Sequence, residues 1–212
     1  MSRIVIAIAA VASLLVTEGA TALAPGPRPF EFDAGGNTLE IEVYKGGLLG
    51  AFGHDHVIAA KEFSGRVLLD PERLQNSSVT LRVAARALTV VDTGISDADR
   101  ARVQSTMLSD KVLDVARFSE IVFVSTGVIQ ARKNGDSWNL TLAGRLSLHG
   151  VEKEATFPVT LRIADGELEA DGEVFLRQTD YGITPVKVAG GMVKVKDTLR
   201  IHFAIHARGT SP

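Results

Sequence analysis

The sequence contains no cysteine, so no disulfide can support the fold and no thiolate can act as a nucleophile or a metal ligand. An excess of one charge is also missing, because 23 Lys and Arg face 25 Asp and Glu. Nucleic-acid binding depends on clustered basic residues that displace phosphate counterions, so we expect no nucleic-acid partner. The serines form no Gly-x-Ser-x-Gly motif, which removes a common hydrolase signature. Several classes of enzyme and binding protein are therefore disfavoured.

A hydrophobic run long enough for a membrane-spanning helix is missing too. The mostly apolar residues 4–16 would span roughly 20 Å as a helix, whereas the hydrocarbon core of a bilayer is about 30 Å thick. This run follows Met-Ser-Arg and precedes small residues at Ala20 and Ala22, an order typical of a signal peptide. We therefore expect a signal peptide at 1–22, export of the mature chain, and no permanent membrane anchor. A proline-rich linker at 23–29 would lead into one domain at 30–208.

Beyond the linker, apolar and polar residues alternate with a period of two. Leu39, Ile41 and Val43, for example, are separated by polar residues, which predicts a strand with one buried and one solvated face. Similar runs occur near residues 67–69, 79–83, 121–123, 140–148, 157–163 and 199–205. Asn134-Gly135, His149-Gly150 and Asp165-Gly166 place glycine where tight hairpins require positive φ, so three consecutive antiparallel hairpins are expected.

One segment breaks the period of two. Val103, Met107 and Leu108 recur at helical spacing, which predicts one surface helix at about 97–110. Asp92, Asp97 and Asp99 stand around the helix entrance, and no two of them have a spacing that requires acid and base roles. We therefore interpret them as N-capping residues. Many strands with a single helix indicate an all-β protein, and the periodicity leaves a sandwich and a closed barrel both open.

Five groups of residues resemble the YceI family, and they occur in the family's order over most of the mature chain. They are Phe30-Glu31-Phe32-Asp33, Glu62-Phe63-Ser64-Gly65 with Leu68-Leu69-Asp70-Pro71, the segment 113–123, Leu146-Ser147-Leu148-His149-Gly150-Val151, and Thr179-Asp180-Tyr181-Gly182-Ile183. The resemblance implies a lipocalin-like antiparallel β-barrel of about eight strands, a number that leaves room for one slender ligand. It also implies a bacterial periplasmic protein that holds an isoprenoid or fatty-acyl lipid without catalysis and without a cofactor. A homodimer is one possible assembly.

An apolar interior would bind a hydrocarbon chain at about 0.8 kcal/mol per buried CH₂. The same alternation would occur in a barrel filled by its own side chains, so the pocket follows from the resemblance more than from the pattern. On the carrier hypothesis, the ligand would contact inward-facing residues and the loop before the second strand. We predict these contact residues to be Leu39, Ile41, Val43, Phe52, His54, His56, Phe123, Leu142, Phe157 and Phe203.

The Gly53-His54-Asp55-His56 segment leaves alternatives open. In an extended chain, His54 and His56 point the same way about 6 to 7 Å apart, so they could support the loop, contact a ligand head group, or share a metal ion. A metal site would need further ligands, and only His149 offers one if it lies close. The alternative function is therefore a metal-binding protein or a metal-dependent hydrolase or isomerase. We interpret His149 as a turn residue that bonds nearby carbonyls, and His202 and His206 as surface residues.

Overall fold

The protein is all-β apart from one α-helix in a computed structural model that describes residues 26–46, 55–188 and 193–209. The strands are β1 (Arg28–Asp33), β2 (Thr38–Gly46), β3 (His56–Ala60), β4 (Phe63–Leu69), β5 (Ser78–Ala84), β6 (Leu88–Val90), β7 (Glu120–Asn134), β8 (Ser137–Leu148), β9 (Val151–Ala164), β10 (Glu167–Arg177), β11 (Lys187–Val188) and β12 (Val193–Gly209). The helices are α1 (Asp97–Leu108) and the 3₁₀ turns η2 (Leu74–Asn76), η3 (Ala85–Ala87) and η4 (Gln178–Tyr181).

Eight strands close into an antiparallel barrel, which confirms the barrel expectation over the sandwich. The order is β1-β4-β5-β7-β8-β9-β10-β12, and β12 pairs back onto β1 through Phe30 opposite Gly209. β1 begins at Arg28, two residues before the start indicated by the sequence, because Arg28 and Pro29 already lie opposite Leu69 and Leu68 of β4. Closure removes the exposed edges that invite aggregation, which suits a fold without disulfides. Within the described ranges, no helix combines the length and the hydropathy that a membrane crossing requires.

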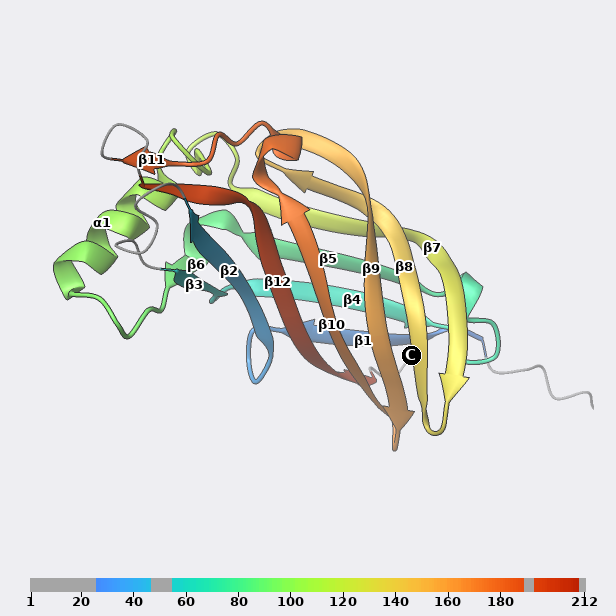
Figure 1. Cartoon of the computed structure of the whole chain (residues 1–212). Coiled ribbons are helices and arrows are strands. Elements are labelled where there is room, and N and C mark those ends of the chain that lie inside the picture. Colours follow the sequence, from blue (N-terminus) through green and yellow to red (C-terminus); the bar gives the residue numbers. More distant parts are fainter. Residues whose placement is uncertain (1–25, 47–54, 189–192, 210–212) are drawn as a thin grey trace, which may run out of the picture.

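The remaining strands extend the wall at one end. β2 pairs with β12, β3 with β2, and β6 with β3, while β11 pairs with the start of β12. Figure 1 shows α1 at this same end, beside β3, β6 and β11. We call it the helix end. The opposite end, which carries η2 and the β7–β8 and β9–β10 turns, is the turn end.

Helix α1 lies at its predicted position but is capped differently from our interpretation. The N-cap is Ser96, whose hydroxyl accepts the Asp99 backbone N–H, while the Asp99 carboxylate accepts the Ser96 hydroxyl. Asp97 and Asp99 occupy the first turn, where the helix dipole favours negative charge. The N-capping prediction for Asp92, Asp97 and Asp99 was therefore wrong, and Asp92 has a different role described below.

The three predicted hairpins are confirmed. β7, β8, β9 and β10 pair in succession as antiparallel neighbours. His149 and Gly150 have φ of 52° and 74°, and Asp165 and Gly166 have φ of 52° and 80°. In each of these two turns both central residues therefore have left-handed φ. This is the arrangement of a type I′ turn, whose twist matches that of the flanking strands.

Each end of the barrel has its own buried cluster. Most members of the clusters are inward residues of the alternating strands, as the period of two predicts, and the helices α1, η2 and η4 with the segments after α1 and η4 supply the others. The helix-end cluster contains Ile58, Ala60, Phe63, Val83, Leu88, Val90, Met107, Leu113, Phe123, Leu146, Leu148, Leu176, Tyr181 and Ile183. The turn-end cluster contains Phe30, Val67, Leu69, Leu74, Val128, Leu140, Leu142, Leu161, Leu168 and Ala207.

Candidate functional site

A cavity runs through the interior of the barrel between the two clusters. Its volume is about 670 Å³, within the range of roughly 300–1,000 Å³ that small-molecule sites occupy. Strands β1 to β10, β12 and one face of α1 all contribute to its lining, which is almost entirely aliphatic and aromatic. The barrel is therefore not filled by its own side chains, so the alternative of a self-filled interior is not what the structure shows.

The residues predicted to contact a ligand fall into two groups. Phe52 and His54 lie outside the described residues, so their contribution stays a prediction. The other eight line the cavity, and they come from six different strands. These are Leu39, Ile41, Val43, His56, Phe123, Leu142, Phe157 and Phe203. The structure thus brings these side chains to one lumen, while ligand binding by them stays a prediction.

Three phenylalanines of this lining occupy the space above glycines of neighbouring strands. A Cβ added at Gly65 would lie 2.1 Å from the Phe32 ring, and one at Gly172 would lie 2.3 Å from the Phe203 ring. The Phe123 ring covers Gly144 in the same way, at 2.5 Å. Each ring therefore rests where another residue would place a side chain. Because the rings fit against the wall, the centre of the barrel stays open.

Polar residues line the cavity mainly at the helix end. Lys45, His56, Asp99, Arg102 and Thr106 belong to this group. His56 lies opposite Val43 in the β2–β3 pair, so the alternation that turns Val43 inward also turns His56 inward. The cavity therefore has an apolar body and a polar end, which is the shape of an amphiphile.

The side chain of His56 is held by Asp92, which follows β6. His56 Nδ1 lies 2.6 Å from Asp92 Oδ2, and the Val57 backbone N–H donates to Asp92 Oδ1 at 2.6 Å. A carboxylate only accepts hydrogen bonds, so the proton of this contact belongs to Nδ1 and the second ring nitrogen, Nε2, points away from Asp92. The exposed fractions of the two side chains are 18% for His56 and 7% for Asp92. Burial at this level strengthens the contact because competing water is excluded.

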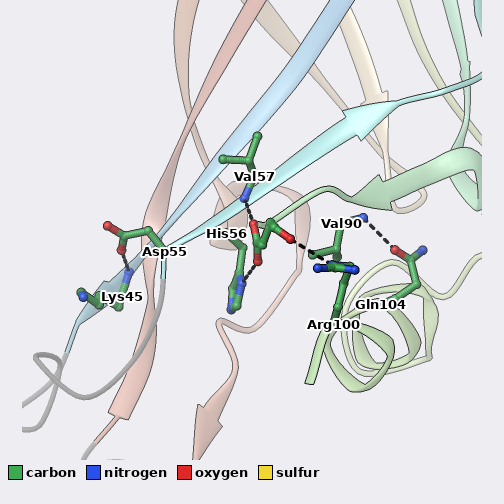
Figure 2. A network of polar contacts seen from close by, with 8 residues as sticks. Lys45, Asp55, His56, Val57, Val90, Arg100 and Gln104 are labelled. Atoms are coloured by element: carbon green, nitrogen blue, oxygen red, sulfur yellow. Dashed lines mark hydrogen bonds and ion pairs between the residues drawn. The ribbon is translucent and has the colours of Figure 1, made fainter. Parts of the chain in front are cut away.

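The same network ties α1 to the edge of the wall, as Figure 2 shows. Arg100 donates from Nε to the Asp92 carbonyl oxygen at 2.9 Å. Gln104 accepts the Val90 backbone N–H and donates to the Leu88 carbonyl oxygen, both at 2.8 Å. The Gln104 amide thus forms the hydrogen bonds that a further strand would otherwise form with the backbone at the edge of β6. Helix α1 covers the cavity through a few side-chain contacts rather than through backbone pairing.

The outer face of the same wall is charged, in contrast with the lumen. Arg200 of β12 donates to Glu42 of β2 and to Glu173 of β10. A hydrogen bond from the Tyr44 hydroxyl, together with Arg200, holds the pKa of Glu42 below its usual value. These groups alternate along the strands with the apolar residues that line the cavity, so the sheet separates a polar exterior from an apolar interior.

The other histidines that the structure describes, His149, His202 and His206, lie away from the cavity lining. His149 Nδ1 is 3.2 Å from the Tyr181 carbonyl oxygen, and its ring packs edge-on against Phe118, consistent with the turn role predicted for it. His206 lies on the outer face, 3.1 Å from a Glu169 carboxylate oxygen. Among the described residues, no group of three or more His, Asp or Glu side chains could hold a metal ion. The metal hypothesis depends on His54 and is therefore untested.

Sequence reasoning missed Asp92 as the partner of His56. The two residues are 36 positions apart, and only the β3–β6 pairing brings them together. A carboxylate directly after a short apolar strand was the one available signal, and it fits a helix cap equally well.

Comparison with known proteins agrees with this geometry. The family model described as a YceI-like domain matches residues 31–207. The chain belongs to the YceI family. A UPF0312 protein of Shewanella denitrificans is 32% identical to it over 101 residues, which are 48% of this chain and 44% of that protein. The match therefore spans less than half the length of that relative.

Solved structures show the same fold for this YceI-family chain. Burkholderia cenocepacia BcnA has a TM-score of 0.64 at 19% identity, with 84% of this chain and 99% of that chain covered. The Campylobacter jejuni YCEI protein has a TM-score of 0.55 at 11% identity, with 73% and 85% covered. At these identities the likeness concerns the barrel and not the ligand.

Proposed function

We propose that this protein is a periplasmic carrier that encloses the apolar chain of an isoprenoid or fatty-acyl lipid and does not transform it. The observation that carries the proposal is the apolar cavity of about 670 Å³ that runs through the barrel. The membership of the YceI family, whose fold is that of a binding protein, supports a binding role.

The energetics of burial favour a chain-like ligand. Each CH₂ removed from water contributes about 0.8 kcal/mol, so ten methylenes contribute roughly 8 kcal/mol before association costs. The aliphatic lining offers hydrogen-bond partners mainly at the helix end, so the middle of the lumen selects for length and width rather than for polar groups. A head group would then lie at the helix end, beside His56.

The test is to purify the protein from its native periplasm, extract it with organic solvent and analyse the extract by lipid mass spectrometry. A stoichiometric lipid with a long apolar chain is the expected result. Metal analysis of the same intact sample runs in parallel. Bound metal without lipid would overturn the proposal and favour the histidine-based metal alternative.

Export is part of the proposal because residues 1–22 have the order of a signal peptide. The intact mass of the purified protein checks it. We expect a mature chain that begins near Leu23 and that is recovered in the periplasmic fraction. A full-length chain recovered from the cytoplasm would contradict this part of the proposal.

A further inference from the structure

Strands β9 and β10 pair with each other over only part of their length. β9 pairs with β8, and β10 with β12, almost from end to end. Between β9 and β10, by contrast, the register ends where Thr160 lies opposite Asp171, after five pairs counted from the turn. Figure 1 shows the two strands moving apart from there toward the helix end. We call this unpaired stretch, residues 151–159 of β9 and 172–177 of β10, the seam.

Pro158 and Gly172 lie where the pairing stops. In an antiparallel sheet the N–H and C=O of one residue face the same neighbouring strand. The Pro158 carbonyl oxygen faces β10, because a Cβ added at Gly172 would lie 2.5 Å from it. The side of β9 on which proline lacks an N–H is therefore the β10 side, so the donor that the next hydrogen bond needs is missing. The Phe203 ring covers Gly172, at 2.3 Å from the same added Cβ.

The seam is bounded at both ends. The paired part of the β9–β10 hairpin bounds it toward the turn end. Toward the helix end, η4 reaches the β8–β9 side, where Lys153 Nζ lies 3.6 Å from Asp180 Oδ1 and His149 Nδ1 lies 3.2 Å from the Tyr181 carbonyl oxygen. Among the described residues, no side-chain hydrogen bond or ion pair joins β9 to β10 between these limits. A stretch of wall about 16 Å long, five residues of β10, is thus held by side-chain packing.

The lumen lies directly behind this stretch. Phe157 of β9 and Leu176 of β10 both line the cavity. The half-buried Phe157 ring packs edge-on against Phe123, with 4.6 Å between the ring centroids. On the outer face of β10, Phe175 is 62% exposed, more than any other large apolar side chain that the structure describes. Apolar side chains therefore stand on the inner and on the outer side of the seam.

The charges along the seam disfavour the strand of another protein as its occupant. Unpaired strand edges invite the addition of a strand, and charged side chains on those edges counteract it. Both edges of the seam carry such side chains, namely Glu152, Lys153, Glu154, Glu173 and Arg177. A hydrocarbon chain needs no backbone partner, so these charges do not oppose its passage between the strands.

We propose that the apolar chain of the ligand enters and leaves the lumen sideways, through the seam between β9 and β10. Phe175 contacts the chain from outside, and Phe157 is the side chain that turns aside to admit it. The proposal rests on the proposed function, because it describes the path of the ligand that fills the lumen. Opening the wall between fully paired strands would break several backbone hydrogen bonds, whereas opening the seam displaces side chains.

The test cross-links the seam. The chain contains no cysteine, so Thr156→Cys with Phe175→Cys introduces one thiol on each edge, and bismaleimidoethane joins the two. Stopped-flow fluorescence measures uptake and release of cis-parinaric acid by the delipidated protein. We expect both rates to fall by about tenfold and the Kd to stay unchanged, because a higher barrier slows both directions equally. The same variant treated with N-ethylmaleimide is the reference, since it has the same substitutions without the cross-link.

The matched control cross-links Thr160→Cys with Asp171→Cys, which lie opposite each other in the paired part of the same strands. This cross-link should leave both rates unchanged. Pro158→Thr restores the missing N–H and should slow exchange without any reagent. Unchanged rates after cross-linking of the seam, or equal slowing by the two cross-links, would overturn the inference. Failure of the wild type to bind cis-parinaric acid would instead overturn the proposed function.

Discussion

Each end of the barrel contains an aspartate whose side chain is largely buried, and the two residues work differently. The Asp70 carboxylate, at the turn end, is 3% exposed and accepts from the N–H groups of Glu72 and Arg73 and from the Asn76 amide. All these partners lie within six residues of Asp70. The Asp92 carboxylate, at the helix end, has partners 35 and 36 residues away. One aspartate therefore shapes a local turn, while the other joins separate elements beside the lumen.

This contrast extends to the groups around them. At the turn end, η2 places Leu74 in the buried cluster with Phe30 and Leu168, and backbone pairing of β1 with β12 completes the wall. At the helix end, the edge of β6 is hydrogen-bonded by a side chain of α1 and not by the backbone of another strand. Contacts made by a few side chains open at lower cost than a continuous ladder. The turn end should therefore carry the stability, and the helix end should carry ligand exchange.

Removing a core side chain from the turn end should have the largest effect. Leu168 is 2% exposed, so Leu168→Ala leaves an unfilled space that the surrounding barrel wall cannot close. We therefore expect a loss of about 3–4 kcal/mol in the free energy of unfolding. Met107→Ala, in α1 at the helix end, should cost only roughly 2 kcal/mol because the helix can adjust. Urea denaturation of both variants measures the difference. An equal or larger loss from Met107→Ala would contradict the assignment of stability to the turn end.

The next effect concerns the lumen between the two ends. Phe32 packs against both clusters, and its ring occupies the space above Gly65. Gly65→Ala should force this ring into the lumen, with a loss of about 2 kcal/mol in unfolding free energy and weaker binding of long-chain probes. Gly94→Ala is the matched control, because a Cβ there meets no atom within 4 Å. Unchanged probe affinity in Gly65→Ala would show that the position of the Phe32 ring does not limit the space available to a ligand in the lumen.

A smaller and more local effect is expected at Asp92. Asp92→Asn keeps a similar volume but replaces one of the two accepting oxygens by an NH₂ group, so it can no longer accept from both His56 Nδ1 and the Val57 N–H. We therefore expect a loss of about 1.5 kcal/mol in the free energy of unfolding. Hydrogen exchange should become faster in α1 and β6 and stay unchanged in β1 and β12. Uniformly faster exchange would mean that Asp92 supports the whole barrel rather than the helix end alone.

The sequence predicted the features that depend on local patterns. The alternation on β2, the turn at His149-Gly150 and the helix at 97–108 follow from periods and turn residues within a few positions. The contacts of Asp92 with His56, and of Gln104 with β6, depend on strand pairing between distant segments, and no local pattern carries that register. For the same reason the sequence identified Gly65 only as part of a family motif and did not predict that the Phe32 ring lies over it. Phe52 and His54 lie outside the described residues and stay predictions.

The smallest effect should distinguish the two aspartates by pH. Burial raises the pKa of the Asp70 carboxylate, but hydrogen bonds from Arg73 and Asn76 outweigh this effect and hold the pKa below its usual value. A group with a lowered folded-state pKa stabilises the protein above its unfolded-state pKa of about 3.9, and this stabilisation is lost as the pH falls toward the folded-state value. The difference in Tm between wild type and Asp70→Asn should therefore be largest near neutral pH and shrink below about pH 4. Thermal melts from acid to neutral pH measure it, and a difference that is constant across this range would mean that Asp70 acts through its shape and not through its charge.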